Sequence, residues 1–251
     1  MKILLTSTSF EDTIGKHHEK LSNTGFVVDK LRGPLKEDML VSVIGDYDGL
    51  ICGDDEITET VIRLGKEGKL KAISKYGIGL DKIDLNAAQK YKIPVANTPG
   101  VNHVAVAEHT FSLMLSHFKN LYLEFSITKQ GGWDRLIGHE VAEKKIAIIG
   151  LGKIGGTFAK MCRSFNLDVY VFDLQYDDEF ITSNNLNILK NINDLDSTFD
   201  IISLHMPLTV ETACVINNNL LNRLSEEVLL INTSRAGVVE KEALIYFLQI
   251  N

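Results

Sequence analysis

The sequence contains few of the residues that mark secreted, disordered or membrane-spanning proteins. Only 3 cysteines and 4 prolines occur among its 251 residues. Cys52, Cys162 and Cys214 lie too far apart for a disulfide framework or a metal-ligand spacing, and we interpret them as small buried or half-buried residues in a reducing compartment. No apolar run reaches the ~20 residues of a membrane helix, and no secretory signal follows Met1. We therefore expect a cytoplasmic protein without a membrane segment or a metal site.

An excess of positive charge is also missing. Lys and Arg number 26 against 33 Asp and Glu, so the net charge is −7 with neutral His. This balance argues against a surface for nucleic acid or anionic membranes, because both need a basic face. The 19 glycines and the 45% of apolar residues suit ordered α/β structure. At ~150 residues per domain, the length predicts one or two domains.

Short apolar runs alternate with amphipathic segments along most of the chain, which favours parallel sheets with crossover helices. The first series predicts strands at 2–6, 26–28, 49–52, 70–74 and 93–97 and helices at 11–21, 36–44, 59–64 and 85–90. The second predicts strands at 145–149, 168–172, 188–189, 199–204 and 228–232 and helices at 153–165, 218–224 and 240–248.

A turn-rich cluster at 97–100 separates the two series. We predict two doubly wound α/β domains, residues 1–98 and 99–251. Near the start of the second lies a helix at 101–118 that is apolar almost all round, which indicates burial between domains or subunits. The polar segment 129–134 follows as a loop and carries the only tryptophan, Trp133.

A glycine pattern, G-x-G-x-x-G, follows the strand at 145–149 and opens the helix at 153–165. Gly150 would permit a tight turn, Gly152 the close approach of a pyrophosphate, and Gly155 close packing of helix on strand. Lys153 and Ile154 begin a helix whose free N–H groups attract phosphates.

Asp173 ends the next strand, close to the expected spacing of ~20 residues beyond the pattern. Its carboxylate would bind ribose hydroxyls and repel a 2′-phosphate. The arrangement therefore favours NAD over NADP. The alternative is a structural glycine turn that binds nothing.

Two further segments follow predicted strands and should line the same crevice, since ligands bind beyond the carboxyl ends of parallel strands. His205, Met206 and Pro207 would face the cofactor, although His205 could instead be a hydrogen-bonded histidine that holds its loop. The other segment places three more candidates at this rim. They are Thr233, Ser234 and Arg235. The guanidinium of Arg235 could orient a carboxylate through two parallel hydrogen bonds, with a surface salt bridge as the alternative.

Six blocks together resemble the family of D-isomer-specific 2-hydroxyacid dehydrogenases. They lie at 75–84, 97–102, 106–108, 150–155, 205–209 and 232–237. The resemblance implies two doubly wound parallel-sheet domains, with a Rossmann domain that binds NAD inserted into a flavodoxin-like substrate domain. It also implies reversible hydride transfer between a 2-hydroxy acid and NAD, and a homodimer formed around the helix at 101–118.

The family's site residues carry over by position. The loop of Tyr76, Gly77, Ile78 and Gly79 would offer backbone N–H groups to a substrate carboxylate, with Asn102 nearby. Ile78 and Val106 would lie near the nicotinamide. Arg235 would be the catalytic arginine that holds the carboxylate and carbonyl of a 2-oxo acid, next to the cofactor.

Two departures from the family pattern affect the expected function. The family's acid/base pair, a carboxylate and a histidine, follows the segment that matches 232–237, so we expect this chain to be shortened and its Rossmann domain incomplete at the C-terminus. The acidic segment 53–56 would repel a phosphate, which disfavours phosphoglycerate as the substrate. Three hypotheses stay open: an NAD-dependent dehydrogenase, a catalytically silent NAD-binding sensor or scaffold, and a folded fragment without function.

Overall fold

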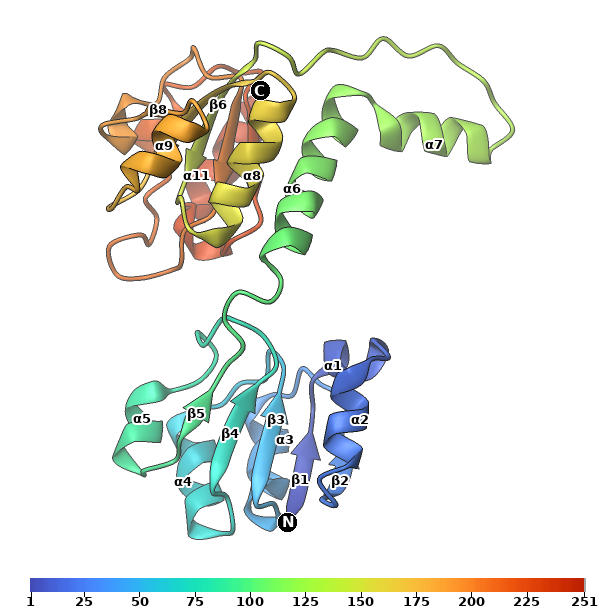
Figure 1. The fold of residues 1–251 in the computed structure, drawn as a ribbon, viewed down its shortest axis with the longest axis vertical. Coiled ribbons are helices and arrows are strands. Elements are labelled where there is room, and N and C mark those ends of the chain that lie inside the picture. Colours follow the sequence, from blue (N-terminus) through green and yellow to red (C-terminus); the bar gives the residue numbers. More distant parts are fainter. Residues whose placement is uncertain (251) are drawn as a thin grey trace. The chain divides into compact units, whose positions relative to one another are not determined.

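The computed structural model describes residues 1–250, and the chain divides into two compact units, Met1–Val101 (unit 1) and Asn102–Asn251 (unit 2). Residue 251, where the second predicted domain ends, lies outside the described residues. Each unit contains one five-stranded sheet, and every strand pair in the two sheets is parallel. The predicted fold class, two α/β domains built on parallel sheets, is confirmed (Figure 1).

In unit 1 the strand order is β2-β1-β3-β4-β5. The strands are β1 (Lys2–Leu5), β2 (Val27–Lys30), β3 (Gly49–Cys52), β4 (Ala72–Lys75) and β5 (Val95–Ala96). The helices are α1 (Thr8–Asp12), α2 (Lys16–Ser22), α3 (Glu37–Val43), α4 (Glu59–Glu67) and α5 (Leu85–Lys90). Leu4, Leu50 and Ile73 from the central strands pack with side chains of α3, α4 and α5 in one buried cluster. The short strand β5 lies at the edge of the sheet, and a proline before it is compatible with either an edge strand or the start of a strand.

The prediction of a single helix over 11–21 is wrong, because the segment forms two short helices. The Ser7 hydroxyl caps α1 by accepting the Phe10 N–H, so the first helix begins earlier than predicted. Thr13 and Gly15 then take extended backbone conformations, which end α1 and start α2 in a new direction.

In unit 2 the strand order is β10-β9-β6-β7-β8. The strands are β6 (Lys145–Ile149), β7 (Asp168–Phe172), β8 (Asn187–Ile188), β9 (Ile201–Leu204) and β10 (Leu229–Asn232). The helices are α6 (His103–Phe118), α7 (Leu121–Lys129), α8 (Lys153–Ser164), α9 (Asp178–Ser183), α10 (Asn218–Leu221) and α11 (Lys241–Ile250). The chain builds outward from β6 to β8, then crosses to β9 on the other side of β6. The junction of β6 and β9 is therefore the topological switch point, the part of such a sheet near which ligands bind.

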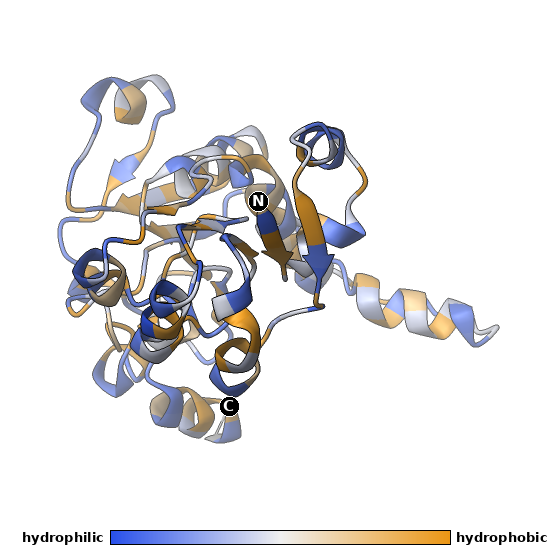
Figure 2. Cartoon of the chain, turned by 90° about the horizontal axis from the view of Figure 1, so that it is seen from below, coloured by the Kyte–Doolittle hydropathy of each residue, from blue (hydrophilic) through white to orange (hydrophobic). Residues whose placement is uncertain are grey.

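Helix α6 packs on α8 through Ala107, Met114 and the ring of Phe111, whose centroid lies 4.7 Å from that of Phe165. Val104 and Leu113 of the same helix are exposed. Helix α7 and the loop after it project from the rest of unit 2 (Figure 1). Figure 2 shows hydrophobic stretches on this projecting helix as well as on the strands. None of the helices in the described part of the chain is long and apolar enough to span a membrane.

Candidate functional site

The glycine turn between β6 and α8 is shaped by backbone contacts that side chains would prevent. Gly150 has a φ of +100°, and a Cβ there would lie 2.8 Å from the carbonyl carbon and oxygen of His205. A Cβ at Gly155 would overlap the carbonyl oxygen of Gly150. Both positions therefore require glycine, and they bring the end of β6 against the end of β9 and the start of α8.

Gly152 is open where the other two glycines are crowded. It is the N-cap of α8, no side chain caps the helix there, and no described atom beyond its chain neighbours lies within 4 Å of a Cβ built on it. The first N–H groups of a helix have no partners within the helix and carry its positive end. The turn therefore presents unobstructed donors to an anion.

Asp173 holds the turn to the end of β7. Its carboxylate accepts the N–H of Leu151 at 2.5 Å, that of Leu174 at 2.6 Å and that of Gln175 at 3.3 Å. Asp173 therefore orders the loop between β6 and α8, which the sequence pattern did not reveal, and its role toward a ribose stays a prediction.

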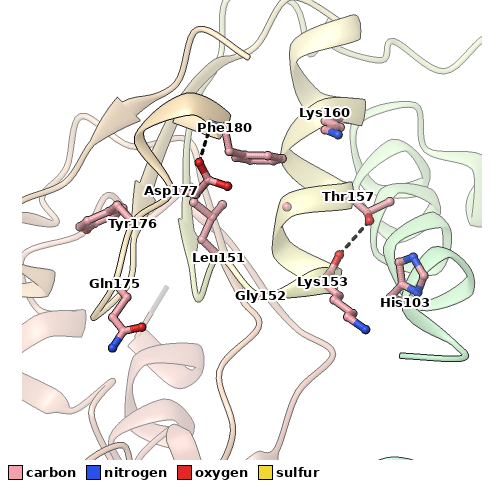
Figure 3. Close-up of a pocket in the computed structure, with 11 residues that line it drawn as sticks. His103, Leu151, Gly152, Lys153, Thr157, Lys160, Gln175, Tyr176, Asp177 and Phe180 are labelled. Carbon is pink, nitrogen blue, oxygen red and sulfur yellow. Dashed lines mark hydrogen bonds between the residues drawn. The ribbon is translucent and has the colours of Figure 1, made fainter. Parts of the chain in front are cut away.

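A cavity of about 710 Å³ opens beside this turn. Figure 3 shows Lys153 and Thr157 on α8, the ring of Phe180 on α9 and His103 at the start of α6 around it. Gly152 and Lys153 are the predicted cofactor residues that line the cavity. Its volume lies within the ~300–1,000 Å³ of small-molecule sites. The open N-terminus, the close turn and the adjoining carboxylate fit a dinucleotide.

His205 follows β9 and is held by its neighbours. Its Nε2 lies 2.8 Å from Ser203 Oγ, and its ring centroid lies 5.3 Å from that of Phe158. Burial lowers the pKa of His205 from 6.5 to about 4, so the imidazole is neutral at physiological pH. The structure thus contains the hydrogen bond that the alternative interpretation of His205 requires. Met206, the next residue, is buried, and Thr212 Oγ1 donates to the carbonyl of Pro207 at 2.6 Å.

The segment after β10 is a tight loop braced by side chains. Asn232 Nδ2 donates to the carbonyl of Arg235 at 2.9 Å, and Asn232 Oδ1 accepts the Ser234 hydroxyl at 2.8 Å. Arg235 Nη1 donates to the carbonyl of Ser234 at 2.9 Å. The loop thus holds the guanidinium near its own backbone.

A contact with α6, which sequence reasoning missed, anchors this loop. Thr110 is fully buried, and its hydroxyl donates to the carbonyl of Val106 at 2.8 Å. Its oxygen lies 3.0 Å from Thr233 Oγ1 and accepts that hydroxyl, because the Thr110 proton is already used. The feature of the sequence that could have indicated this contact is a threonine, Thr110, among the apolar residues of the helix. The pair joins the α6 turn that carries Val106 to the loop that carries Arg235.

The 76–79 loop follows β4 in unit 1, whereas Asn102 and Val106 belong to unit 2. Within the loop the Tyr76 N–H donates to the carbonyl of Cys52 at 2.9 Å, and the Gly77 N–H donates to Thr98 Oγ1 at 3.1 Å. The N–H groups of Ile78 and Gly79 donate to no acceptor among the described residues. Two adjacent donors of this loop are therefore available to a carboxylate. No group of three His, Cys, Asp or Glu side chains in residues 1–250 is placed to hold a metal ion.

Comparison with known proteins gives one family match. Residues 111–251 match the model of the D-isomer specific 2-hydroxyacid dehydrogenase, NAD binding domain. The chain is 32% identical over 247 residues to D-3-phosphoglycerate dehydrogenase of Methanocaldococcus jannaschii. This alignment covers 97% of this chain and 46% of that protein. It is 33% identical over 216 residues to hydroxypyruvate reductase of Thermotoga maritima, covering 84% of this chain and 68% of that one.

A solved structure is similar over the whole chain. The NAD⁺-bound 3-phosphoglycerate dehydrogenase of Entamoeba histolytica aligns with a TM-score of 0.79 and 29% identity, covering 100% of this chain and 77% of that one. The chain spans less than half the length of two of the phosphoglycerate dehydrogenases that it matches, 46% and 38%.

Proposed function

The chain belongs to the family of D-isomer specific 2-hydroxyacid dehydrogenases, and from this premise we propose that it takes part in hydride transfer between NAD and a small 2-hydroxy acid. In the oxidation, the acid would lose a hydride from C2 and a proton from its hydroxyl, leaving a 2-oxo acid. NAD supplies the acceptor for the hydride. The observation that carries the proposal is the open Gly152 turn with Asp173 beside it.

Residues of each unit are proposed to take part in this reaction. Gly150, Gly152 and Gly155 would let the pyrophosphate reach the N-terminus of α8, and Asp173 would hold the ribose. The free N–H groups of Ile78 and Gly79 would bind the substrate carboxylate.

Arg235, braced by its loop, would orient the carboxylate and polarise the carbonyl. The remaining predicted contacts are proposed near the cofactor or substrate. They are Tyr76, Gly77, Asn102, Val106, Lys153, Ile154, His205, Met206, Pro207, Thr233 and Ser234.

One observation favours a second candidate, an NAD-binding module without turnover. Hydride transfer to and from a hydroxyl carbon needs an acid/base group that titrates near neutral pH. His205 is the histidine that follows β9 at the switch-point edge, and its lowered pKa of about 4 keeps it neutral there. We therefore do not propose His205 as the proton donor of the reduction at pH 7.

Both candidates are tested by mixing the chain with NADH and a panel of 2-oxo acids. Absorbance reports oxidation of NADH and nicotinamide fluorescence reports binding. We expect binding, and oxidation with at least one acid. Binding without oxidation would favour the silent module. If the chain gave neither binding nor oxidation, both proposals would be refuted.

A pair of variants ties the result to the proposed site. Asp173→Ala should abolish NADH binding. Asp168→Asn, at the other end of β7 and bonded to Asn187 at 2.8 Å, should leave it unchanged. Equal affinity in the two variants would contradict the role of Asp173.

We also propose that the chain acts as a homodimer. Helix α7 exposes Tyr122 and Phe125 at 63% and 71%, and α6 exposes Val104 and Leu113 in the same unit. Exposed apolar surface of this kind marks interfaces. Light scattering should report a dimer that Phe125→Ser converts to a monomer. Val210→Ser, at a side chain that is 91% exposed but lies outside α7, should have no effect, and a monomeric wild type would refute the proposal.

A cytoplasmic location is proposed because all three cysteines are free, including the exposed Cys214. Free thiols persist in a reducing compartment.

A further inference from the structure

A buried lysine stands directly before the loop proposed to bind the substrate carboxylate. Lys75 ends β4, and its side chain is only 5% exposed. Its Nζ donates to the carbonyl of Gly53 and to Asp54 Oδ1 at 2.6 Å. The same Nζ lies 4.0 Å from the position that a Cβ on Gly77 would take. The ammonium is therefore next to the 76–79 loop, at the edge of the sheet where the ends of β3 and β4 meet.

The charge of this lysine is neutralised by the chain itself. Asp54 faces solvent, with 84% of its side chain exposed, yet its carboxylate turns to Lys75. An ammonium has three donor protons, and two of them are taken by Gly53 and Asp54. The lysine therefore has one donor left and no net charge to offer a second anion.

The neighbouring acid holds this arrangement in place. Asp55 is fully buried, and its carboxylate accepts the Thr6 hydroxyl at 2.6 Å, the Leu35 N–H at 2.6 Å and the Gly53 N–H at 2.9 Å. The peptide groups on both sides of Gly53 are thus fixed, the N–H by Asp55 and the carbonyl by Lys75. Asp54 lies between these anchors, so its backbone cannot swing away from the lysine without breaking them.

We propose that the Lys75–Asp54 pair is a specificity determinant that selects an unphosphorylated 2-hydroxy acid and rejects a phosphorylated one. This inference rests on the proposed function, which leaves that choice open. A phosphate carries a charge of ~−1.5 to −2 at neutral pH. At this edge it would meet the carboxylate of Asp54 and could reach the ammonium only by displacing it. A single carboxylate bound by the N–H groups of Ile78 and Gly79 meets no such obstacle.

The test compares glycerate with 3-phosphoglycerate, which differ only in the phosphate. Both are titrated into the full chain with NAD present, by calorimetry. We expect wild type to bind glycerate at least ~10-fold more tightly, which is the scale of one charge contact that water largely screens. Asp54→Asn frees the ammonium and should reduce this preference by about tenfold, through tighter binding of the phosphorylated acid alone. Asp54 itself is exposed but its partner Lys75 is buried, so the substitution should lower the melting temperature by no more than ~4 °C.

Two further variants separate the pair from the general charge of the loop. Glu56→Gln removes the same charge two residues away without freeing Lys75, so it should keep the wild-type preference. Adding Lys75→Met to Asp54→Asn should cancel the gain for 3-phosphoglycerate.

The outcomes distinguish this inference from the proposed function. Wild type that prefers the phosphorylated acid, or equal shifts in Asp54→Asn and Glu56→Gln, would overturn the inference while leaving hydride transfer intact. If the chain bound NAD but neither of the two acids, both the inference and the proposed role of the substrate loop would be overturned. The proposed cofactor site would stand.

Discussion

Replacing Gly152 by alanine separates the fold of the glycine turn from its capacity to hold a dinucleotide. A Cβ at Gly152 would touch nothing within 4 Å beyond its chain neighbours, and the φ of −65° is open to any residue. Alanine at such a position stabilises a protein by ~0.4–1 kcal/mol, because the unfolded chain loses freedom. The melting temperature of the free chain should therefore stay equal or rise by ~1–4 °C.

The same methyl group would stand where a pyrophosphate approaches α8. At an NADH concentration 100 times the Kd, wild type should gain ~2.7 kcal/mol of stability, or ~5–10 °C. If Gly152→Ala weakens binding by ~100-fold, the gain at that concentration falls to ~0.4 kcal/mol, or less than ~2 °C. The variant should thus be as stable as wild type without NADH and clearly less stable with it.

Thermal unfolding followed by circular dichroism, with and without NADH, measures both effects. Gly155→Ala is the matched control, since its Cβ would overlap the Gly150 carbonyl and should cost ~1–3 kcal/mol in the free chain. A Gly152→Ala chain that keeps the full NADH-dependent rise would refute the assignment of this open space to a pyrophosphate. A Gly155→Ala chain that melts like wild type would refute the packing argument.

Three other predictions follow from buried polar groups. Thr110→Val should lower kcat/KM for a 2-oxo acid by ~10-fold without changing the Kd of NADH, because the Thr233 hydroxyl loses its acceptor. Thr110→Ser keeps that acceptor and should keep kcat/KM near the wild-type value. Equal losses in both variants would contradict a positioning role. Burial lowers the pKa of His205 from 6.5 to about 4, so as the pH falls the unfolded chain takes up this proton at a higher pH than the folded chain does. Up to roughly 3 kcal/mol of stability should therefore be lost as the pH falls from 6.5 to about 4. Denaturant titrations of His205→Asn should show a shallower pH dependence, and an identical one would contradict the burial effect. Asp55→Ala should lower the free energy of unfolding by at least ~3 kcal/mol, because two buried donors and one half-buried donor lose their acceptor. The exposed Asp54→Ala should cost under ~1 kcal/mol, and equal denaturation midpoints in the two variants would refute this.

The strands that sequence reasoning located best are the buried ones. Those at 49–52, 145–149 and 168–172 coincide with β3, β6 and β7, since a parallel strand covered on both faces is a continuous apolar run. The prediction of one helix over 11–21 is wrong because the backbone conformation changes within the segment. Thr13 and Gly15 leave the helical region, and apolar periodicity does not register that change.

The sequence by itself determined the α/β architecture and the glycine turn, because both depend on residues close together in the chain. Gly150, Gly152 and Gly155 stand within one turn, and their spacing is the same before and after folding. The family assignment followed from local blocks of this kind.

Only the tertiary structure decided which polar groups meet. Thr110 reaches Thr233 across 123 positions because α6 packs beside β10, and Lys75 reaches Asp54 across 21 because β3 and β4 are neighbours. The neutral state of His205 arises from its burial against Phe158 and Ser203. Such pairings depend on which strands and helices lie side by side. Local periodicity in the sequence does not encode that order, so the tertiary fold determines which polar groups surround the site.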